Sequence, residues 1–537
     1  MARRLAQEHW TIRKPAIVGS GGIVSTQHYL ASEVGAEMLR TGGNAIDAAI
    51  AAGLAIGVVE PWSSGIGGGG YMTVHLADKR STKVVEFGMR APFASTPADY
   101  PLDPSQGITG AGNFNWPAVK GHVNVSGPLS IAVPGYIRGA ALALETFGSK
   151  SWEEIIEPAC QLADEGLPID WFATMHITNF ARGLSRFEGS KSMYLPDGFP
   201  PLGAGEGFVS RLPLTQLAKT YRTIQREGPD AYYVGPLAQS IVADLNELGN
   251  KITTRDLEEY QPFVREPITS IYRGATVQTP SNMTAGPSMQ QALAILKHHE
   301  FASDRPNADD VIAYVEALRQ TYEFRLSNLG EGKTQLGENH TSHLSVADEN
   351  GNMVALTQTV MSPFGSLVVL PNTGLTMNNG MMWFDPLPDR PNSLVGGRHP
   401  LCNMCPTLLF RDDGTRFAVG ACGGRKIFPS VLQLTSFVLD FAMDINDAVH
   451  QPRVDVSGNE NVWAMDHFSD DILDALRAKY ETTKVRSNGL GGNQFAVPQI
   501  VAARPDGRFE GGCYVPSPHA AVATVEADSM RDATTLS

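Results

Sequence analysis

The sequence predicts a large mixed α/β protein, in which helical patterns dominate residues 1–340 and strand patterns dominate residues 341–537. In the first part apolar residues recur at helical spacing, and in the second apolar and polar residues alternate as in half-buried strands. The chain has 537 residues, more than the roughly 250–300 that one hydrophobic core usually serves. It therefore forms either two or more domains or one large interleaved α/β unit.

Residues 30–60 contain the first predicted pair of helices. The first helix stops at Gly42 and Gly43, and Asn44 caps the second, whose alanine-rich face favours close packing. The glycines of residues 65–70 lead into a strand, and a turn over residues 78–80 joins it to a second strand. Later segments are assigned by the same patterns: residues 130–250 as mainly helical, 257–282 as turns and strands, and 288–299 and 309–329 as helices.

A polar connector, residues 330–341, separates the helical part from the strand-rich part. Beyond it the alternating pattern predicts strands at residues 343–348, 352–360, 366–371, 405–413 and 416–422. A helix is predicted over residues 431–450, and a strand-rich tail follows it.

The strands at 343–348 and 352–360 form a predicted hairpin around the turn DENGN. A three-residue loop with Gly351 in the left-handed conformation places Thr341 opposite Thr359. A two-residue Asn-Gly turn instead places Thr359 opposite Ser342. In either register the two threonines lie close together, because opposed residues are roughly 4.5–5.5 Å apart at Cβ. Threonine pairs are common in sheets, so the hairpin alone indicates no more than structure.

Composition excludes several classes of function. The net charge of −14 argues against nucleic acid and against an anionic membrane surface, because both attract lysine and arginine. No run of about 18 apolar residues occurs, so no membrane span is expected. The first 22 residues lack the apolar core of a secretory signal. Five cysteines indicate reduced thiols and a cytoplasmic location.

No metal or other cofactor is predicted. The pair Cys402 and Cys405 has CxxC spacing, but no further ligands lie nearby, and we interpret both as structural. The thirteen histidines form no HExxH-like motif. The run Gly67–Gly70 lacks the GK[ST] ending of a phosphate-binding loop, so close packing near a site is the better interpretation.

Several segments resemble the γ-glutamyltranspeptidase family and occur in the family's order. They include LASEVGAEMLRTGGNAIDAAIAAGLAIGVVEPWSSGIGGGGYMTV, AVPGYIRGAALALETFG, YRGATVQTPSNMTAGPS and ACGGRKI. The resemblance implies an N-terminal-nucleophile hydrolase fold, a four-layer αββα sandwich. It also implies one precursor that cuts itself before Thr341 into a large subunit, 1–340, and a small subunit, 341–537. The product would be a heterodimer of self-cleaved subunits, with a dimer of such heterodimers as a further option.

The resemblance also implies roles for individual residues. Thr341 Oγ would attack the carbonyl of His340, and the freed α-amine would then act as the base for the same hydroxyl. Such an amine has a reference pKa of about 7.7–8.0, so part of it is unprotonated near neutrality. Thr359 resembles the residue that orients this amine. Gly423 and Gly424 match the pair whose amides stabilise the oxyanion, although a glycine turn after a strand is the ordinary structural alternative.

The substrate-binding pattern departs from the family. Gly88 occupies the place of the arginine that grips the α-carboxylate, and Arg90 lies two residues on, on the same strand face. The segment that binds the α-amino group reads NNGMMWFDP, with Asn379 kept and Gly380 and Trp383 at the key places. A site that loses hydrogen-bonding partners changes its substrate by large factors.

Other family positions have changed as well. The expected paired serines are Cys402 and Asn403, and Met361 replaces an asparagine. These features resemble the branch that contains oxamate amidohydrolase, and related acylases. The candidates for gripping a substrate carboxylate are Arg90, Arg398, Arg425 and Lys426, although most such cations merely face solvent or support the fold.

The sequence therefore predicts a self-cleaving threonine amidohydrolase that acts on a small amide, oxamate-like or acyl. One alternative is a true γ-glutamyl hydrolase or transpeptidase. The alternative from another class is a non-catalytic binding relative.

Overall fold

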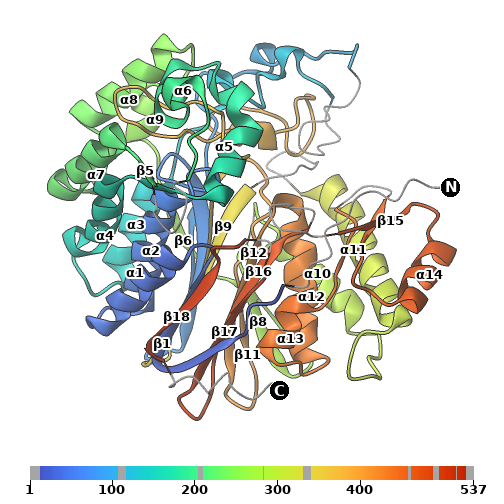
Figure 1. The fold of residues 1–537 in the computed structure, drawn as a ribbon. Helices are drawn as coiled ribbons and strands as arrows, with labels where there is room; N and C mark the ends of the chain where they lie inside the picture. The colour runs from blue at the N-terminus through green and yellow to red at the C-terminus, as the bar shows by residue number, and fades with distance from the viewer. Residues whose placement is uncertain are drawn as a thin grey trace.

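The computed structural model describes residues 12–106, 117–203, 210–281, 283–329, 340–457, 461–487, 495–515 and 517–527. One continuous 13-stranded sheet folds into two packed layers at the centre, called the first and the second sheet below. Helices cover the outer face of each layer (Figure 1). This is the four-layer αββα sandwich that the family resemblance implies. The expected connector falls mostly on residues 330–339, which lie outside the described residues.

The first sheet is antiparallel and combines strands from both parts of the chain. In spatial order it contains β6 (Phe263–Arg265), β3 (Ser81–Phe87), β2 (Gly69–Leu76), β10 (Met353–Met361), β9 (His340–Asp348), the second half of β1 (Ile17–Thr26) and β18 (Ala521–Ala527). The second sheet contains β17 (Phe509–Cys513), β16 (Val497–Ala503), β12 (Arg416–Cys422), β11 (Thr407–Phe410), β8 (Ala275–Thr279) and β7 (Ile268–Tyr272). The chain is thus one interleaved unit.

Strand β1 belongs to both sheets. Its first residues, Ile17–Gly19, pair with β17, and Gly22–Ser25 pair with β9. Where the pairing changes, Gly21 and Gly22 have φ of 75° and 140°, a conformation that only glycine adopts readily. This bend lets one strand pass from one layer to the other.

Helices of the first part cover the first sheet: α1 (Tyr29–Arg40), α2 (Ala45–Val59), α3 (Tyr136–Phe147), α4 (Trp152–Glu165), α5 (Trp171–Leu184), α6 (Glu188–Tyr194), α7 (Thr215–Glu227), α8 (Pro236–Glu247) and α9 (Thr254–Glu258). Every residue of α2 is buried, and Asn44 caps it through a capping box with Asp47. The predicted helix pair and its cap are therefore confirmed.

The second sheet is covered by α10 (Gly286–Leu296), α11 (Ala308–Asn328), α12 (Ile427–Leu439) and α13 (Ile445–His450) (Figure 1). Beyond them lie α14 (Asp470–Lys479) and a small sheet of β13 (Val454–Asp455), β14 (Val462–Met465) and β15 (Thr483–Arg486). A separate pair joins β4 (Leu167–Ile169) and β5 (Ser210–Leu212).

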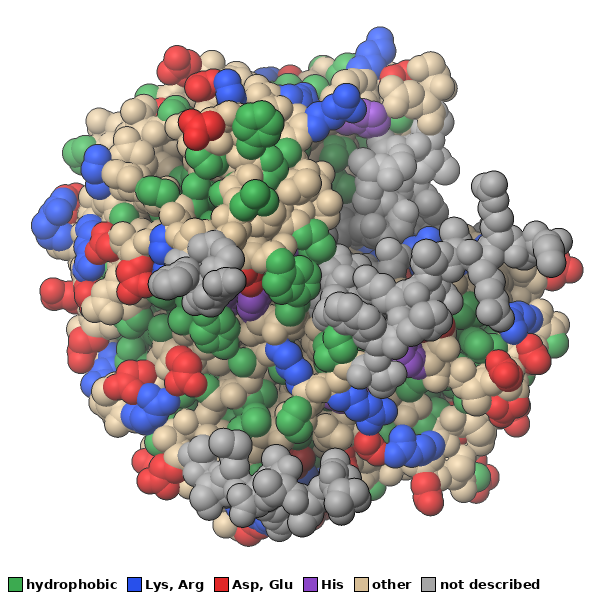
Figure 2. All heavy atoms as spheres, viewed as in Figure 1, with side chains coloured by type: hydrophobic (Ala, Val, Ile, Leu, Met, Phe, Trp, Pro, Cys, Tyr) green, Lys and Arg blue, Asp and Glu red, His purple; other side chains and the backbone are tan. Residues whose placement is uncertain are grey.

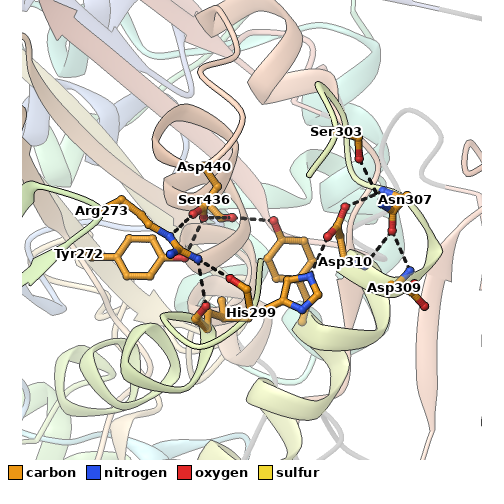
Figure 3. A network of polar contacts seen from close by, with 11 residues as sticks. Tyr272, Arg273, His299, Ser303, Asn307, Asp309, Asp310, Ser436 and Asp440 are labelled. Carbon is orange, nitrogen blue, oxygen red and sulfur yellow. Dashed lines mark hydrogen bonds and ion pairs between the residues drawn. The ribbon is translucent and has the colours of Figure 1, made fainter. Parts of the chain in front are cut away.

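A polar network fastens this outer helical layer to the edge of the second sheet (Figure 3). Asp440, at the end of α12, has a side chain that is 1% exposed. Its carboxylate accepts hydrogen bonds from the Tyr272 hydroxyl and from Arg273 Nε, both at 2.8 Å. The His299 ring lies 2.7 Å from the Asp310 carboxylate. The network joins α10, α11 and α12 to the turn after β7.

The space between the sheets holds a cluster of buried apolar residues: Ile23, Ala347, Met353, Ala355, Leu408, Ala418, Val501 and Phe509. On the face shown in Figure 2, acidic and basic side chains are interspersed over both helical layers. Among the described residues, no helix combines the length and the apolarity needed to cross a bilayer.

The β9–β10 hairpin has the register of the three-residue loop. Val354 pairs with Val346 and Gln358 with Ser342, and Gly351 has a φ of 87°. The register shifts near the open end, where Met361 faces His340. The alternative two-residue turn was wrong.

Two predicted elements differ in the structure. Residues 366–371 are not a strand, because Leu367 has a φ of 66° and only the bridge of Val369 to Thr376 forms there. The helix expected over 431–450 begins earlier, at Ile427, and is two helices, α12 and α13, separated by residues 440–444.

Candidate active site

Two threonine hydroxyls meet at the open end of the hairpin. Thr341, near the start of β9, is 2% exposed, and its Oγ1 donates to Thr359 Oγ1 at 3.5 Å. Thr359 Oγ1 also accepts a 2.7 Å hydrogen bond from the Met361 amide. The long distance between the hydroxyls is at the edge of hydrogen bonding. The predicted juxtaposition of the two side chains is present.

Strand β2 lies close against Thr359. Gly69 pairs with Thr359, and a Cβ at Gly68 would overlap the Thr359 carbonyl. A Cβ at Gly67 would likewise overlap the carbonyl of Thr376. The glycine run thus permits close packing beside the threonines, as predicted from the sequence.

His343 connects the candidate nucleophile to the second sheet. It lies on the same face of β9 as Thr341, and its ring fills the space over Gly420 of β12. Its Nδ1 is 2.9 Å from Thr357 Oγ1 and its Nε2 is 3.0 Å from Ser345 Oγ. Burial lowers the pKa of His343 to about 3, so the ring is neutral. Sequence reasoning missed this residue, because its position depends on the packing of two sheets.

The turn after β12 lies at the same end of the sandwich. Gln27 accepts a 3.1 Å hydrogen bond from the His343 amide and donates to Cys422, the last residue of β12. Gly423 and Gly424 follow with φ of 130° and 63°. A Cβ at Gly423 would lie 2.7 Å from Ala496 Cα, so the turn requires glycine there. The role of the two amides as oxyanion donors stays a prediction.

The predicted substrate residue Arg90 is bound to the protein itself. Its guanidinium donates to the carbonyls of Asp256, at 2.8 Å, and Glu259, at 3.3 Å. It also lies 4.3 Å from the centre of the Phe93 ring. These contacts hold the end of α9. Binding of a substrate carboxylate by Arg90 stays a prediction.

Two predicted amide side chains also have partners within the protein. Asn379 Nδ2 donates to the carbonyl of Val125 and to Ser362 Oγ, both at 2.8 Å. Asn403 Oδ1 accepts a 3.3 Å hydrogen bond from Arg325, a buried arginine of α11. Asn379 therefore supports the chain after Thr359, where its backbone amide also donates to the Val360 carbonyl, and Asn403 is held by α11.

The remaining candidates differ in burial. Arg425 is fully buried, so it is not a solvent-facing surface cation, whereas Arg398 is partly exposed. Trp383 is buried, and its carbonyl accepts a 2.6 Å hydrogen bond from Asn392. Asp385 accepts a 2.9 Å hydrogen bond from the Leu387 amide, and burial raises its pKa to about 6.

An apolar cluster occupies the region where the family's charged handles are expected. We call it the methionine–aromatic cluster; its buried members are Tyr71, Met89, Ala91, Tyr100, Val119, Ala132, Met361, Met381, Met382, Trp383, Phe384, Leu394, Cys402 and Met404. A Cβ at Gly88 would lie 2.6 Å from the Tyr71 hydroxyl, so Tyr71 fills the place of a longer side chain. The methionines are visible in the sequence, but their assembly is not.

Metal chemistry has no structural support in the part of the chain described: no group of three or more His, Cys, Asp or Glu side chains there is arranged to hold an ion. All five cysteines are buried free thiols. Burial raises the pKa of Cys402 and of Cys405 to about 12, which fits a structural role.

The family model described as Gamma-glutamyltranspeptidase matches residues 31–337 and 330–515. The chain belongs to the γ-glutamyltranspeptidase family. A glutathione hydrolase is similar to this chain over most of its length. The glutathione hydrolase proenzyme of Bacillus subtilis (strain 168) is 31% identical over 529 residues, which cover 88% of this chain and 87% of its own.

Two acylases are also similar to this chain. The acylase ACY 1 proenzyme of Pseudomonas sp. (strain SE83) is 32% identical over 538 residues, 94% of this chain and 93% of its own. The crystal structure of cephalosporin acylase from Bacillus halodurans superposes with a TM-score of 0.84 at 25% identity, over 98% of this chain and all of that one. The protein is thus an enzyme of amide hydrolysis or acyl transfer.

Proposed function

We propose that the protein is a self-cleaving amidohydrolase whose nucleophile is Thr341. The observation that carries the proposal is the buried Thr341 hydroxyl beside the Thr359 hydroxyl, at the start of β9. Two of its relatives are named proenzymes, which agrees with a chain that must be cut before it acts.

The chemistry uses one hydroxyl twice. Thr341 Oγ attacks the His340 carbonyl carbon, the peptide C–N bond breaks, and water hydrolyses the resulting ester. The products are a carboxylate at His340 and a free α-amine at Thr341. In turnover that amine accepts the Oγ proton while Oγ attacks the substrate amide, and water then releases the acyl group.

The methionine–aromatic cluster favours an amide whose acyl part is apolar. A γ-glutamyl substrate needs partners for its ammonium and carboxylate groups, and burying charges without partners is costly. At the family's positions this protein has Gly88, covered by Tyr71, and Gly380, which packs against Ala132 and Met89. Hydrolysis of an acyl amide therefore fits better than hydrolysis of glutathione.

A second candidate substrate is a small carboxylate amide such as oxamate. Arg425 and Lys426 follow directly after Gly423 and Gly424, so two cations lie within the turn expected to face the substrate carbonyl. Buried Asp455 interacts electrostatically with both cations. This neighbourhood is the observation that favours oxamate.

Two measurements test the function. The purified wild-type chain should give fragments 1–340 and 341–537, Thr341→Ala should stay uncut, and Thr341→Ser should keep some cutting. Cleavage of Thr341→Ala at the same bond would refute the mechanism, and a permanently uncut wild-type chain would favour a non-catalytic relative.

Substrate choice is tested on the cut enzyme with three probes: γ-glutamyl-p-nitroanilide, oxamate and an acyl-p-nitroanilide with an apolar acyl group. We expect the acyl amide to be hydrolysed with the highest kcat/KM. Strong γ-glutamyl turnover would refute the specificity argument, and selective oxamate turnover would favour the second candidate.

The heterodimer of cut fragments and a cytoplasmic location are part of the same proposal. The buried free thiols agree with a reducing compartment.

A further inference from the structure

Glu60 is a buried acid at the end of the helix that covers β9. It follows the last residue of α2 and is 2% exposed. Burial raises its pKa well above the usual value for a glutamate. A carboxyl group in this environment stays protonated unless a cation lies beside it to stabilise the charged form.

The other buried carboxylates of the described residues all have hydrogen bonds. They are Asp47, Asp244, Asp256, Asp310, Asp348, Asp385 and Asp455. Within the described part of the chain the Glu60 carboxylate takes part in no hydrogen bond and no ion pair. Buried polar groups normally have partners, so this exception requires an explanation.

The fold places Glu60 at the nucleophile's end of the sheet. Helix α2 begins at the far end of β9, where the Ala45 amide donates to Asp348 at 2.9 Å. It ends near the start of β9, where Ser64 Oγ lies 2.9 Å from Ser342 Oγ. The amides of Ser63 and Ser64 donate to the Glu60 carbonyl at 2.9 and 3.3 Å. The turn after Glu60 is thus fastened to the residue that follows Thr341.

The opposite strand reaches the same place. The Ser63 carbonyl accepts a 3.2 Å hydrogen bond from Val360, next to Thr359. Glu60 lies close enough to Cys422, the residue before the glycine turn, for a negative charge on its carboxylate to raise the pKa of that thiol. The negative end of a helix dipole also favours a cation here. Glu60 therefore lies among the elements that carry both threonines and the glycine turn.

The glycine turn carries two cations, Arg425 and Lys426, and both interact electrostatically with Asp455. Burial alone raises the pKa of Glu60, without an opposing effect of a cation.

Burial also lowers the pKa of His176, which stacks on Trp62, to about 4. Burial lowers the pKa of His343 on β9, and of His28 after β1, to about 3 in each case. Burial raises the pKa of Cys422 to about 12, and it raises the pKa of Tyr221, whose hydroxyl contacts α2, well above 10. None of these groups supplies a cation for Glu60.

We propose that the α-amine freed at Thr341 is the partner of Glu60, and that the Glu60 carboxylate orients this amine and stabilises its protonated form. The inference rests on the proposed function. It supplies the third member of an arrangement in which a nucleophile is activated by a base and the base is held by another group. Glu60 is a positioning residue, because it acts through the amine.

The protons balance in each step. As Oγ attacks the substrate, its proton moves to the α-amine and forms an ammonium beside the carboxylate. The ammonium then gives the proton to the leaving amine, and Glu60 stays ionised throughout. Before cleavage no such cation exists, so the acid remains in its neutral form. After cleavage the freed amine takes the proton of Glu60, and the ammonium so formed favours the charged carboxylate. Loss of one proton from this ammonium to solvent then gives the neutral amine that starts turnover.

The test compares Glu60→Gln with the wild type after both have been cut. A carboxylate raises the pKa of a neighbouring amine, so its removal should move the acid limb of kcat/KM to lower pH, by about one pH unit or more. We expect kcat to fall about tenfold or more, with a smaller change in KM. Asp310→Asn is the matched control, because it neutralises a buried carboxylate in the opposite helical layer (Figure 3) and should keep the wild-type acid limb.

Several outcomes would overturn the proposal. One is a cut Glu60→Gln enzyme with the wild-type kcat and acid limb. Another is a stably folded Glu60→Gln chain that stays uncut, because the amine exists only after cleavage. If Glu60→Gln does not fold, Glu60→Asp is tested instead, because its carboxylate lies one methylene farther from the amine. The acid limb of kcat/KM must then move to lower pH, and an unchanged acid limb would again overturn the proposal. Failure of the proposed function would be seen separately, in the Thr341 variants with Glu60 intact.

Discussion

Thr359 uses one hydroxyl oxygen for two contacts, from the Thr341 hydroxyl and from the Met361 amide. The second contact fixes the oxygen in place, so the first is held ready for the nucleophile. This is how an ordinary pair of strand threonines becomes a positioned pair, and only one of its two contacts could be expected from the hairpin.

Replacing Thr359 with valine should slow cutting and turnover by roughly 10²-fold, the effect of losing one well-placed polar group in an active site. The variant should also lose about 1–3 kcal/mol of stability, because the Met361 amide is left buried without its acceptor. The appearance of fragment 341–537 with time measures the first effect, and denaturant unfolding measures the second. Thr359→Ser should retain most of both, whereas wild-type cutting by the valine variant would contradict the assignment.

At this scale the sequence predicts residues that act through local pattern. Thr341 and Thr359 follow from hairpin register and family motif, and the structure brings them together. Glu60 and Tyr71 could not be predicted, because the first depends on where α2 ends against β9. Tyr71, on the neighbouring strand β2, fills the space that a side chain at position 88 would occupy. Such roles depend on tertiary packing and leave no local signal.

At the scale of elements, the distance between β9 and β12 decides whether the nucleophile and the glycine turn can act together. The His343 ring lies directly on Gly420, which has no side chain in its way. The hairpins and most helices follow from periodicity and turn residues. The segment 366–371 was predicted wrongly because its apolar run resembles a strand, while its backbone at Leu367 turns to positive φ.

Replacing Gly420 with alanine should force the two sheets apart, because the new methyl group would overlap the His343 ring. Overpacking of this kind typically costs about 1–3 kcal/mol of stability. It should also lower kcat by moving Thr341 away from the glycine turn. Unfolding midpoints and turnover of the cut enzyme check both effects. Gly65→Ala is the matched control for stability, since its Cβ would meet only the Gly57 carbonyl, at 3.6 Å; equal behaviour of the two variants would argue against the His343 contact.

At the scale of the whole molecule, the two expected fragments are woven together. Strand β2 of the first fragment pairs with β10 of the second, β1 lies between β9 and β17, and β8 pairs with β11. Both sheets therefore contain strands of both fragments. Sequence reasoning left open whether the chain forms separate domains, because strand order depends on contacts between distant segments.

This arrangement predicts that cutting before Thr341 does not separate the fragments. Neither fragment can leave without breaking strand pairs in both sheets and exposing the core between them. The cut protein should therefore elute as one species in native size-exclusion chromatography. Fragments 1–340 and 341–537 should separate only in denaturant, and both should unfold in a single shared transition. The uncut Thr341→Ala chain serves as the control and should elute with the cut protein. Separation of the fragments under native conditions, or a folded fragment 341–537 by itself, would contradict the interleaved fold.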